Sequence, residues 1–208
     1  MKRIIVSVTN DLSTDQRVDK ICSTLKQNNF EVLLIGRIIK SSFSLNRPYK
    51  TKRISLIFNK GILFYAEYNL RLFFILLFSK KDIFLSNDLD TLLANYLASL
   101  IQNKKLVYDS HELFSEVPEL VNKPSVKKIW IGLEKVLLPK LKNCYTVCNS
   151  IALYYNKKYA SNFKVVRNLP LKKAKIIKGK LNIETSGKKI ILYQGSVNIG
   201  RGLELMID

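Results

Sequence analysis

The stretch IFLSNDLDTLLANYLASLIQNKKLVYDSHE, residues 83–112, decides the fold. Its two short apolar runs, residues 83–85 and 106–108, have the length and composition of buried strands. Between them, apolar side chains recur at helical spacing and form one stripe: Leu89, Leu92, Leu93, Tyr96, Leu97 and Leu100. A strand, a helix and a second strand in this order are typical of a parallel sheet with crossover helices. The stretch therefore predicts an α/β fold.

The same alternation of short apolar runs and helical periodicities continues on both sides. We expect strands at residues 4–8, 30–35, 53–58, 144–148, 165–166 and 190–193. We expect helices from a capping box at Ser13 and Gln16, and at residues 62–78, 125–138, 151–159 and 203–207. The predicted class is a Rossmann-like parallel sheet with helices on both faces.

The composition changes after residue 170. The segment KKAKIIKGK, residues 172–180, carries five lysines and is typical of a linker or solvated loop. We therefore expect a domain at residues 1–170, a basic linker at 171–189 and the start of a second domain at 190–208. One strand, one loop and part of a helix cannot enclose a core. The sequence thus predicts that this chain carries its second domain incomplete.

The net charge of +19 in 208 residues indicates an anionic partner. Nucleic acids, phospholipid headgroups and phosphorylated small molecules are all anionic partners that fit this charge. The chain has no helix-turn-helix, RNA-recognition or zinc-finger pattern, and charge alone supports the nucleic-acid reading. We therefore expect no nucleic-acid partner.

The three cysteines, Cys22, Cys144 and Cys148, are odd in number, and the N-terminus lacks the apolar run of a secretory signal. Both features favour a reduced, cytoplasmic protein. Cys144 and Cys148 lie in the apolar run CYTVC, where buried packing is favoured over metal binding. We expect no metal site.

The most membrane-like segment is LRLFFILLF, residues 70–78. Its apolar run is far shorter than the roughly 18 residues that a spanning helix requires. Two interpretations remain open: a helix buried in the core, or an amphipathic helix that lies against a bilayer surface.

Polar side chains follow the carboxyl ends of four predicted strands, where open parallel sheets bind their ligands. These residues are Asn10, Asp11 and Arg17, then Asn87 and Asp88, then Asp109, His111 and Glu112, and finally Asn168. His111 is the only histidine. A single histidine is more often structural, but the neighbouring carboxylates favour its charged form and a functional role.

Several segments resemble the GT4-like group of GT-B glycosyltransferases: NDLSTDQRVDKICSTL (10–25), SNDLDTLLANYLAS (86–99), YDSHELFSEVPEL (108–120), VVRNLP (165–170) and YQGSVNIGRGLELMI (193–207). The resemblance covers nearly the whole chain in the expected order. It implies two Rossmann-like domains that face each other across a cleft. The N-terminal domain would take the acceptor and the C-terminal domain the nucleotide-sugar donor.

The resemblance further implies a retaining sugar transfer that requires no metal or other cofactor. His111 matches the family's catalytic histidine near the transferred sugar, and the polar residues named above would line the acceptor cleft. Gly195 and Arg201 match the positions that hold the donor diphosphate, whereas Ser196 departs from the basic residue that often follows this glycine. The family's paired glutamates of the donor domain have no counterpart here, so we expect this chain alone to be inactive.

The partners implied are a nucleotide-sugar donor, a lipid-linked or saccharide acceptor and an anionic membrane surface. Such an enzyme would work in the cytoplasm, peripherally on the inner face of the cytoplasmic membrane. The alternative is a non-catalytic module, or truncated gene product, that docks to a membrane or to a partner.

Overall fold

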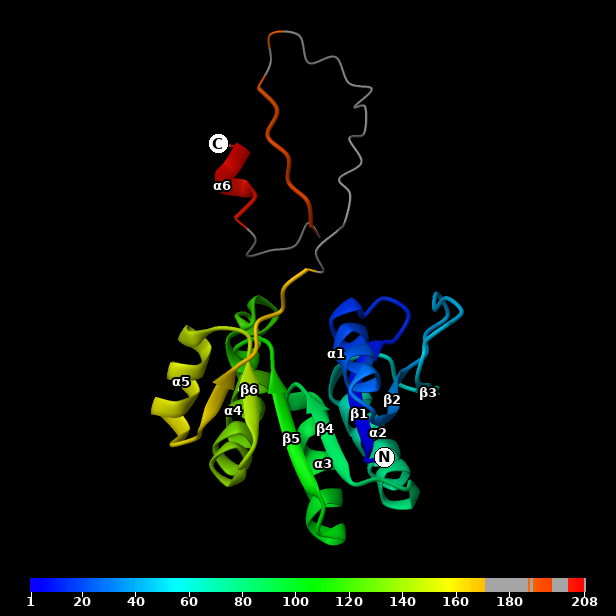
Figure 1. Ribbon diagram of the computed structural model, residues 1–208. Helices are drawn as coiled ribbons and strands as arrows, with labels where there is room; N and C mark the ends of the chain where they lie inside the picture. The colour runs from blue at the N-terminus through cyan, green and yellow to red at the C-terminus, as the bar shows by residue number, and fades with distance from the viewer. Residues whose placement is uncertain (171–186, 188, 196–201, 208) are drawn as a thin grey trace. The chain divides into compact units, whose positions relative to one another are not determined.

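The computed structural model describes residues 1–170, 187, 189–195 and 202–207, and it divides the chain into two compact units. The first unit is Met1–Asn168 and the second is Leu169–Asp208. Figure 1 shows the first unit as a sheet covered by helices. The expected linker at residues 171–189 lies almost entirely outside the described residues.

The first unit is built on one seven-stranded sheet with the order β3-β2-β1-β4-β5-β6-β7. Every neighbouring pair is parallel. The strands are β1 (Arg3–Asp11), β2 (Glu31–Arg37), β3 (Lys50–Ile54), β4 (Ile83–Asn87), β5 (Lys105–Ser110), β6 (Cys144–Thr146) and β7 (Phe163–Val165). The predicted Rossmann-like parallel sheet is confirmed.

The helices are α1 (Gln16–Gln27), α2 (Gly61–Phe78), α3 (Leu89–Gln102), α4 (Pro124–Leu137) and α5 (Asn149–Tyr159), with α6 (Glu204–Ile207) in the second unit. From β1 to β2 the chain moves one way along the sheet, and from β3 to β7 it moves the other way. Because parallel crossovers are right-handed, α1 lies on one face and α2 to α5 lie on the other. Figure 1 shows α1 in front of the sheet and α3 behind it. Helices on both faces are thus confirmed.

The two faces of the sheet have separate cores. On the α1 face, Val18 and Cys22 pack against Val6 and Leu34. On the opposite face, α2 and α3 pack over Ile5, Ile35 and Phe84, and an aromatic cluster of α4 and α5 follows further along the sheet. Burial of about 25 cal/mol per Å² of apolar surface is the main force that closes both layers.

The third strand begins three residues earlier than expected, since β3 is Lys50–Ile54 rather than residues 53–58. Its pairing with β2 ends at Ile54 opposite Arg37. The backbone N–H groups of Ile57 and Phe58 donate instead to the carboxylate of Glu67. The apolar run at residues 54–58 therefore misled the prediction, because most of it follows the strand.

The N-cap of α1 is Asp15, and the predicted capping box at Ser13 and Gln16 is wrong. The Asp15 carboxylate accepts a hydrogen bond from the N–H of Val18 at 3.0 Å. Ser13 instead donates its hydroxyl to Asp11 at 2.7 Å. The helix begins at Gln16, two residues too late for a cap at Ser13.

Residues 190–193 are not a strand, which corrects the expectation for this segment. A strand needs a neighbour for its backbone groups, and the described part of the second unit contains none. Ile190, Ile191 and Leu192 are exposed. The short helix expected at residues 203–207 is present as α6.

The cap assignment gives a first prediction. Replacing Asp15 by Ala removes the acceptor for an N–H in the first turn of α1, and we expect a loss of about 1 kcal/mol in unfolding free energy. Ser13→Ala is the matched control and should cost less than half as much. Urea unfolding followed by circular dichroism measures both, and equal costs would contradict the assignment.

Candidate functional site

A pocket of about 600 Å³ lies at the carboxyl edge of the sheet. Four of the residues predicted from the sequence line it: Asn10, Asp11, Arg17 and His111. The other lining residues are Thr14, Asp15, Gln16, Arg37, Ile39, Ser41 and Phe43. The pocket thus combines the β1–α1 loop, the segment after β2 and the loop after β5, as expected for a parallel sheet.

Hydrogen bonds within the β1–α1 loop hold its polar residues at the pocket. Asp11 accepts from the N–H and the hydroxyl of Ser13, and these bonds contribute to an Asp11 pKa below its ordinary value despite burial. Asn10 donates to the carboxylate of Asp15 at 2.9 Å. The loop also depends on Gly36, because a Cβ there would lie 2.9 Å from the Asn10 carbonyl oxygen and clash with Leu12.

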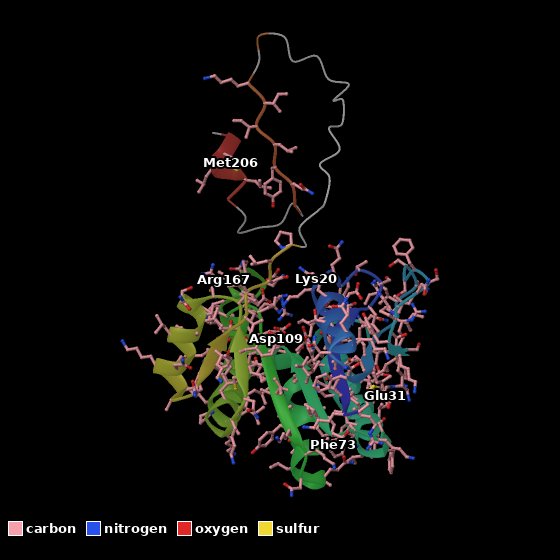
Figure 2. All side chains as sticks on the ribbon, in the orientation of Figure 1. Lys20, Glu31, Phe73, Asp109, Arg167 and Met206 are labelled. Atoms are coloured by element: carbon pink, nitrogen blue, oxygen red, sulfur yellow. The ribbon has the colours of Figure 1, made fainter. Side chains whose placement is uncertain are left out.

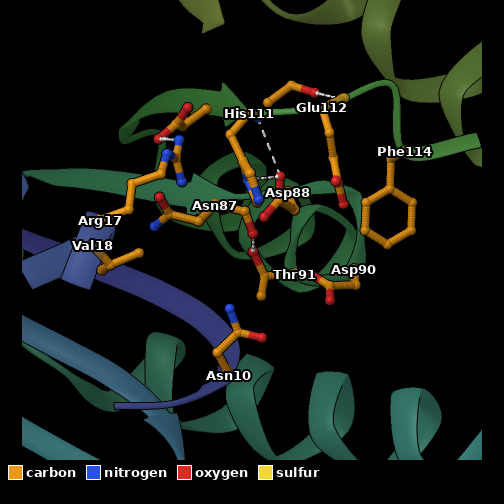
Figure 3. Close-up of polar contacts among 12 residues, drawn as sticks. Asn10, Arg17, Val18, Asn87, Asp88, Asp90, Thr91, His111, Glu112 and Phe114 are labelled. Carbon is orange, nitrogen blue, oxygen red and sulfur yellow. Dashed lines mark hydrogen bonds and ion pairs between the residues drawn. The ribbon is translucent and has the colours of Figure 1, made fainter. Parts of the chain in front are cut away.

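His111 contacts the carboxylate of Asp88, and Figure 3 shows the imidazole directed toward it. Nδ1 of His111 and Oδ1 of Asp88 are 2.7 Å apart, an ion pair without linear hydrogen-bond geometry. Burial alone would lower the pKa of His111, but the hydrogen-bonding contact and charge of Asp88 raise it above the ordinary value. Since Nδ1 faces Asp88, Nε2 is the nitrogen left to meet a ligand in the pocket.

Asp88 has a strained backbone, with φ of 59° and ψ of 169°. This region is nearly restricted to glycine and costs on the order of 1–3 kcal/mol for other residues. The N–H of Asp88 donates to the carbonyl oxygen of Asp109 at 2.8 Å, which holds the strained loop against β5. Asp88 Oδ1 also accepts from the His111 N–H at 3.4 Å, so the carboxylate contacts both the backbone and the side chain of His111.

A second buried carboxylate, Asp90, lies beside this pair. The hydroxyl of Thr9 donates to it, while its other oxygen has no hydrogen-bond partner among the described residues. Burial and the charge of Asp88 together raise the pKa of Asp90 to about 7. Asp90, beside the pair of His111 and Asp88, can therefore take up or release a proton near neutral pH.

Asp109 anchors Arg17 at the floor of the pocket. The Arg17 guanidinium donates to its carboxylate, and the Asp109 side chain is fully buried. Burial raises the pKa of Asp109 to about 6 in spite of the neighbouring arginine. The role of Asp109 is thus to orient Arg17 rather than to meet a ligand directly.

The remaining predicted residues take other places. Asn87 is fully buried and donates to the carbonyl oxygen of Ser7, so it joins β4 to β1 beneath the pocket. Asn168 accepts from the ammonium group of Lys20 at 2.6 Å. Glu112 has an exposed side chain, and its carbonyl oxygen accepts from the hydroxyls of Ser110 and Tyr155. None of the three is among the lining residues of the pocket.

Tyr155 holds the loop that carries His111. Its hydroxyl contacts the Ser110 hydroxyl at 3.3 Å, the Glu112 carbonyl oxygen at 3.3 Å and the Phe114 N–H at 3.4 Å. The ring stacks on Phe163 with centroids 4.7 Å apart. One side chain of α5 thus fixes both flanks of His111.

Arg37 is the main pocket residue that the sequence analysis missed. It ends β2, directly after Gly36, and so it satisfies the same strand-end rule that found the other clusters. Its guanidinium carbon lies 4.9 Å from the ring centroid of Phe64, a cation–π contact, and its Nε is buried without a hydrogen-bond partner in the described part of the chain.

The described residues contain no group of three or more His, Cys, Asp or Glu side chains arranged to hold a metal ion. Cys22 and Cys144 are buried, as expected for Cys144, whereas Cys148 is partly exposed, against expectation. Gly195 lies in the second unit, and Arg201 lies outside the described residues, so the predicted diphosphate position stays a prediction.

No family model and no curated protein sequence matches the chain. Solved structures do match. A sucrose-phosphate synthase from Thermosynechococcus elongatus has a TM-score of 0.61 at 10% identity, over 80% of this chain and 48% of its own. The apo form of WaaB, a lipopolysaccharide outer core galactosyltransferase, has a TM-score of 0.54 at 13% identity, over 84% and 47%.

A third match is the S. aureus MnaA–UDP co-structure, with a TM-score of 0.53 at 16% identity, over 79% of this chain and 43% of the other. The chain therefore spans less than half the length of these three proteins. At such identities the similarity shows the fold alone: the Rossmann-like N-terminal half of a GT-B structure.

The His111–Asp88 pair gives a second prediction. Because His111 is the only histidine, its ring protons give an isolated NMR titration. We expect a pKa above about 6.5 in the wild type and a lower one in Asp88→Asn, since burial and Arg17 lower the pKa and the charge of Glu112, the smallest of the influences, then opposes them without Asp88. Asn has nearly the same size and shape as Asp, which limits structural change. Equal titration in both proteins would show that the pair does not exist in solution.

Asp90 gives a third prediction. Its folded pKa of about 7 exceeds the ordinary value of 3.8, so the folded state binds the extra proton between these limits. Stability is therefore lost as pH rises from about 4 to 7. Asp90→Asn should unfold with a shallower pH dependence and be more stable at pH 8, by at least about 1 kcal/mol. Urea midpoints at several pH values measure this, and a steeper dependence in the variant would contradict the assignment.

Proposed function

We propose that this chain is the acceptor-side half of a retaining, nucleotide-sugar-dependent glycosyltransferase of the GT4-like group. The observation that carries the proposal is His111, which lines the pocket at the carboxyl edge and is oriented by Asp88. The GT-B-type fold supports the same reading, because this edge is where sheets of this kind bind their ligands.

His111 is the residue proposed to touch the transferred sugar. With Nδ1 paired to Asp88, Nε2 exchanges a hydrogen bond with a sugar hydroxyl in the pocket. Arg17 and Asn10 contact the acceptor from the opposite wall. Asp88 and Asp109 act through His111 and Arg17 as positioning residues.

The donor is proposed to be a nucleotide sugar held mainly by a second domain. One of the structural matches is a complex with UDP, which supports a nucleotide ligand for this kind of fold. We infer that Gly195 and Arg201 contact the diphosphate and that no metal takes part. The departing diphosphate is then stabilised by basic side chains and backbone N–H groups.

We further propose a lipid-linked or saccharide acceptor, in the synthesis of a cell-surface polysaccharide or glycolipid on the cytoplasmic side of the membrane. The excess of 35 basic over 16 acidic residues supports an anionic setting of this kind. The 208 residues alone are proposed to lack transfer activity, because the donor site is incomplete without a second domain.

The fourth prediction tests His111. Residues 1–168 are joined to the donor domain of WaaB, and binding of UDP- and GDP-sugars is measured by calorimetry for the chimera and for the 208-residue chain. We expect binding in the chimera only, and transfer to a lipid-linked acceptor that falls at least about 100-fold in His111→Ala.

Glu119→Gln is the matched control, since Glu119 is an exposed carboxylate of the same loop and is absent from the pocket lining. It should transfer at the wild-type rate. Tight donor binding by the 208-residue chain would contradict the placement of the donor site. Unchanged transfer in His111→Ala would remove His111 from catalysis and favour the alternative of a binding module.

A further inference from the structure

The outer side of α2 is apolar and open. This helix has 18 residues with a mean hydropathy of 1.5, and by length and composition alone it could cross a membrane, although only 22% of it is buried. Its inner row, Phe64, Tyr68, Leu72 and Leu76, fills the core. Leu70, Phe74 and Phe78 on the other side are 60%, 49% and 84% exposed. A helix that is apolar all round is normally covered all round.

The open side of α2 continues onto α3. Asn69 joins the two helices, because its amide donates to the Asp90 carbonyl oxygen at 2.7 Å and accepts from the Ala94 N–H at 3.3 Å. The outward residues of α3 near its C-terminal end are again apolar and exposed: Leu97, Leu100 and Ile101. We call Leu70, Phe74, Phe78, Leu97, Leu100 and Ile101 the outer apolar face. Single exposed leucines are ordinary, but a patch that spans two neighbouring helices marks an interaction site.

In the layer formed by α2, α3 and α4, acidic and basic side chains differ in exposure. Helices α2, α3 and α4 contain three acidic residues. Asp90 and Glu134 are buried. Glu67, with a side chain that is 12% exposed, accepts from the N–H groups of Ile57 and Phe58 and forms an ion pair with Arg71. Arg71, Lys128 and Lys135 on the same helices are exposed. Because Arg71 neutralises Glu67 and the other two carboxylates are buried, Lys128 and Lys135 give the outer side of this layer a net positive charge.

We propose that the outer apolar face docks this protein side-on to a lipid bilayer with anionic headgroups. Apolar side chains that enter the interface together with lysines and arginines that meet the headgroups are the two components of surface binding. A second copy of the chain fits less well, because two molecules of net charge +19 repel each other.

The contacts of α2 with the sheet support surface binding rather than spanning. Tyr68 donates to the Val8 carbonyl oxygen at 2.5 Å, and Leu72 and Leu76 lie in the core beside Ile5 and Phe84. Withdrawing the helix into a bilayer would expose that core. Figure 2 shows Phe73 of α2 toward one end of the unit and Lys20 and Arg167 toward the other. The inference thus concerns a different surface from the His111 pocket and stands independently of the proposed transfer activity.

The fifth prediction is tested by sedimentation of the full 208-residue chain with vesicles. We expect binding to vesicles of equal parts phosphatidylglycerol and phosphatidylcholine, little binding to phosphatidylcholine alone, and weakening with salt. Leu70→Gln with Phe78→Gln should reduce the bound fraction at least about tenfold, because both side chains are exposed and Gln preserves the helix. Lys128→Glu with Lys135→Glu should reduce it as well.

Leu153→Gln is the matched control, since Leu153 is a 69% exposed apolar residue of α5 outside the outer apolar face. It should bind as the wild type does, and circular dichroism checks that every variant is folded. Equal binding by the control and the Leu70/Phe78 variant would overturn the proposal. So would wild-type dimers in sedimentation equilibrium that the Leu70/Phe78 variant abolishes, because a second copy would then be the occupant.

Discussion

The contact between His111 and Asp88 ties the loop after β5 to the loop after β4, and the rest of the pocket depends on that tie. Asp88 contacts His111 from a backbone at a positive φ, and its N–H donates to the Asp109 carbonyl oxygen. Asp109 in turn orients Arg17, which extends the same network to α1. One strained residue thus connects the loop after β4 with β5 and, through Asp109, with α1; strained residues cluster at functional sites.

The raised pKa values of His111, Asp90 and Asp109 follow from the number of carboxylates buried at the carboxyl edge of the sheet. Asp88 and Asp90 follow β4, and Asp109 lies in the adjacent strand β5; Arg17 and His111 provide positive charge beside them. The pKa of His111 rises for that reason, while the pKa values of Asp90 and Asp109 rise chiefly because burial disfavours their charged forms. In a site of this composition the Asp88 carboxylate favours the charged form of the imidazole and orients the ring before a ligand arrives. The outer side of helices α2 to α4 has a different chemistry, with exposed apolar and basic side chains.

Much of the site could be predicted because parallel strands bring their carboxyl ends to one edge. That rule alone placed Asn10, Asp11, Arg17 and His111 at one pocket. It also implied Arg37, which was overlooked because the polar stretch after Gly36 was interpreted as a connecting segment rather than as part of the edge. The rule could not distinguish residues that line the pocket from residues that lie beneath it. His111 lines the pocket, whereas Asn87 and Asp109 lie beneath it. The rule gives only the edge, because side chains along a strand alternate between the two faces and each loop has its own conformation. The cap at Asp15 and the bounds of β3 were missed because local propensity does not record which carboxylate or which strand is within reach.

The sequence by itself determined the alternation of strands and helices, the parallel sheet and the edge at which the polar residues gather, because these depend on periodicity along the chain. Only the tertiary structure decided that α2 buries one side and leaves an apolar side open, and that Asp90 of α3 and Glu134 of α4 are buried. It alone placed the Asp88 carboxylate against the imidazole of His111, 23 positions along the chain. The reason is physical: periodicity fixes which face of an element is apolar, whereas pairing, strain and exposure depend on which other elements pack against it.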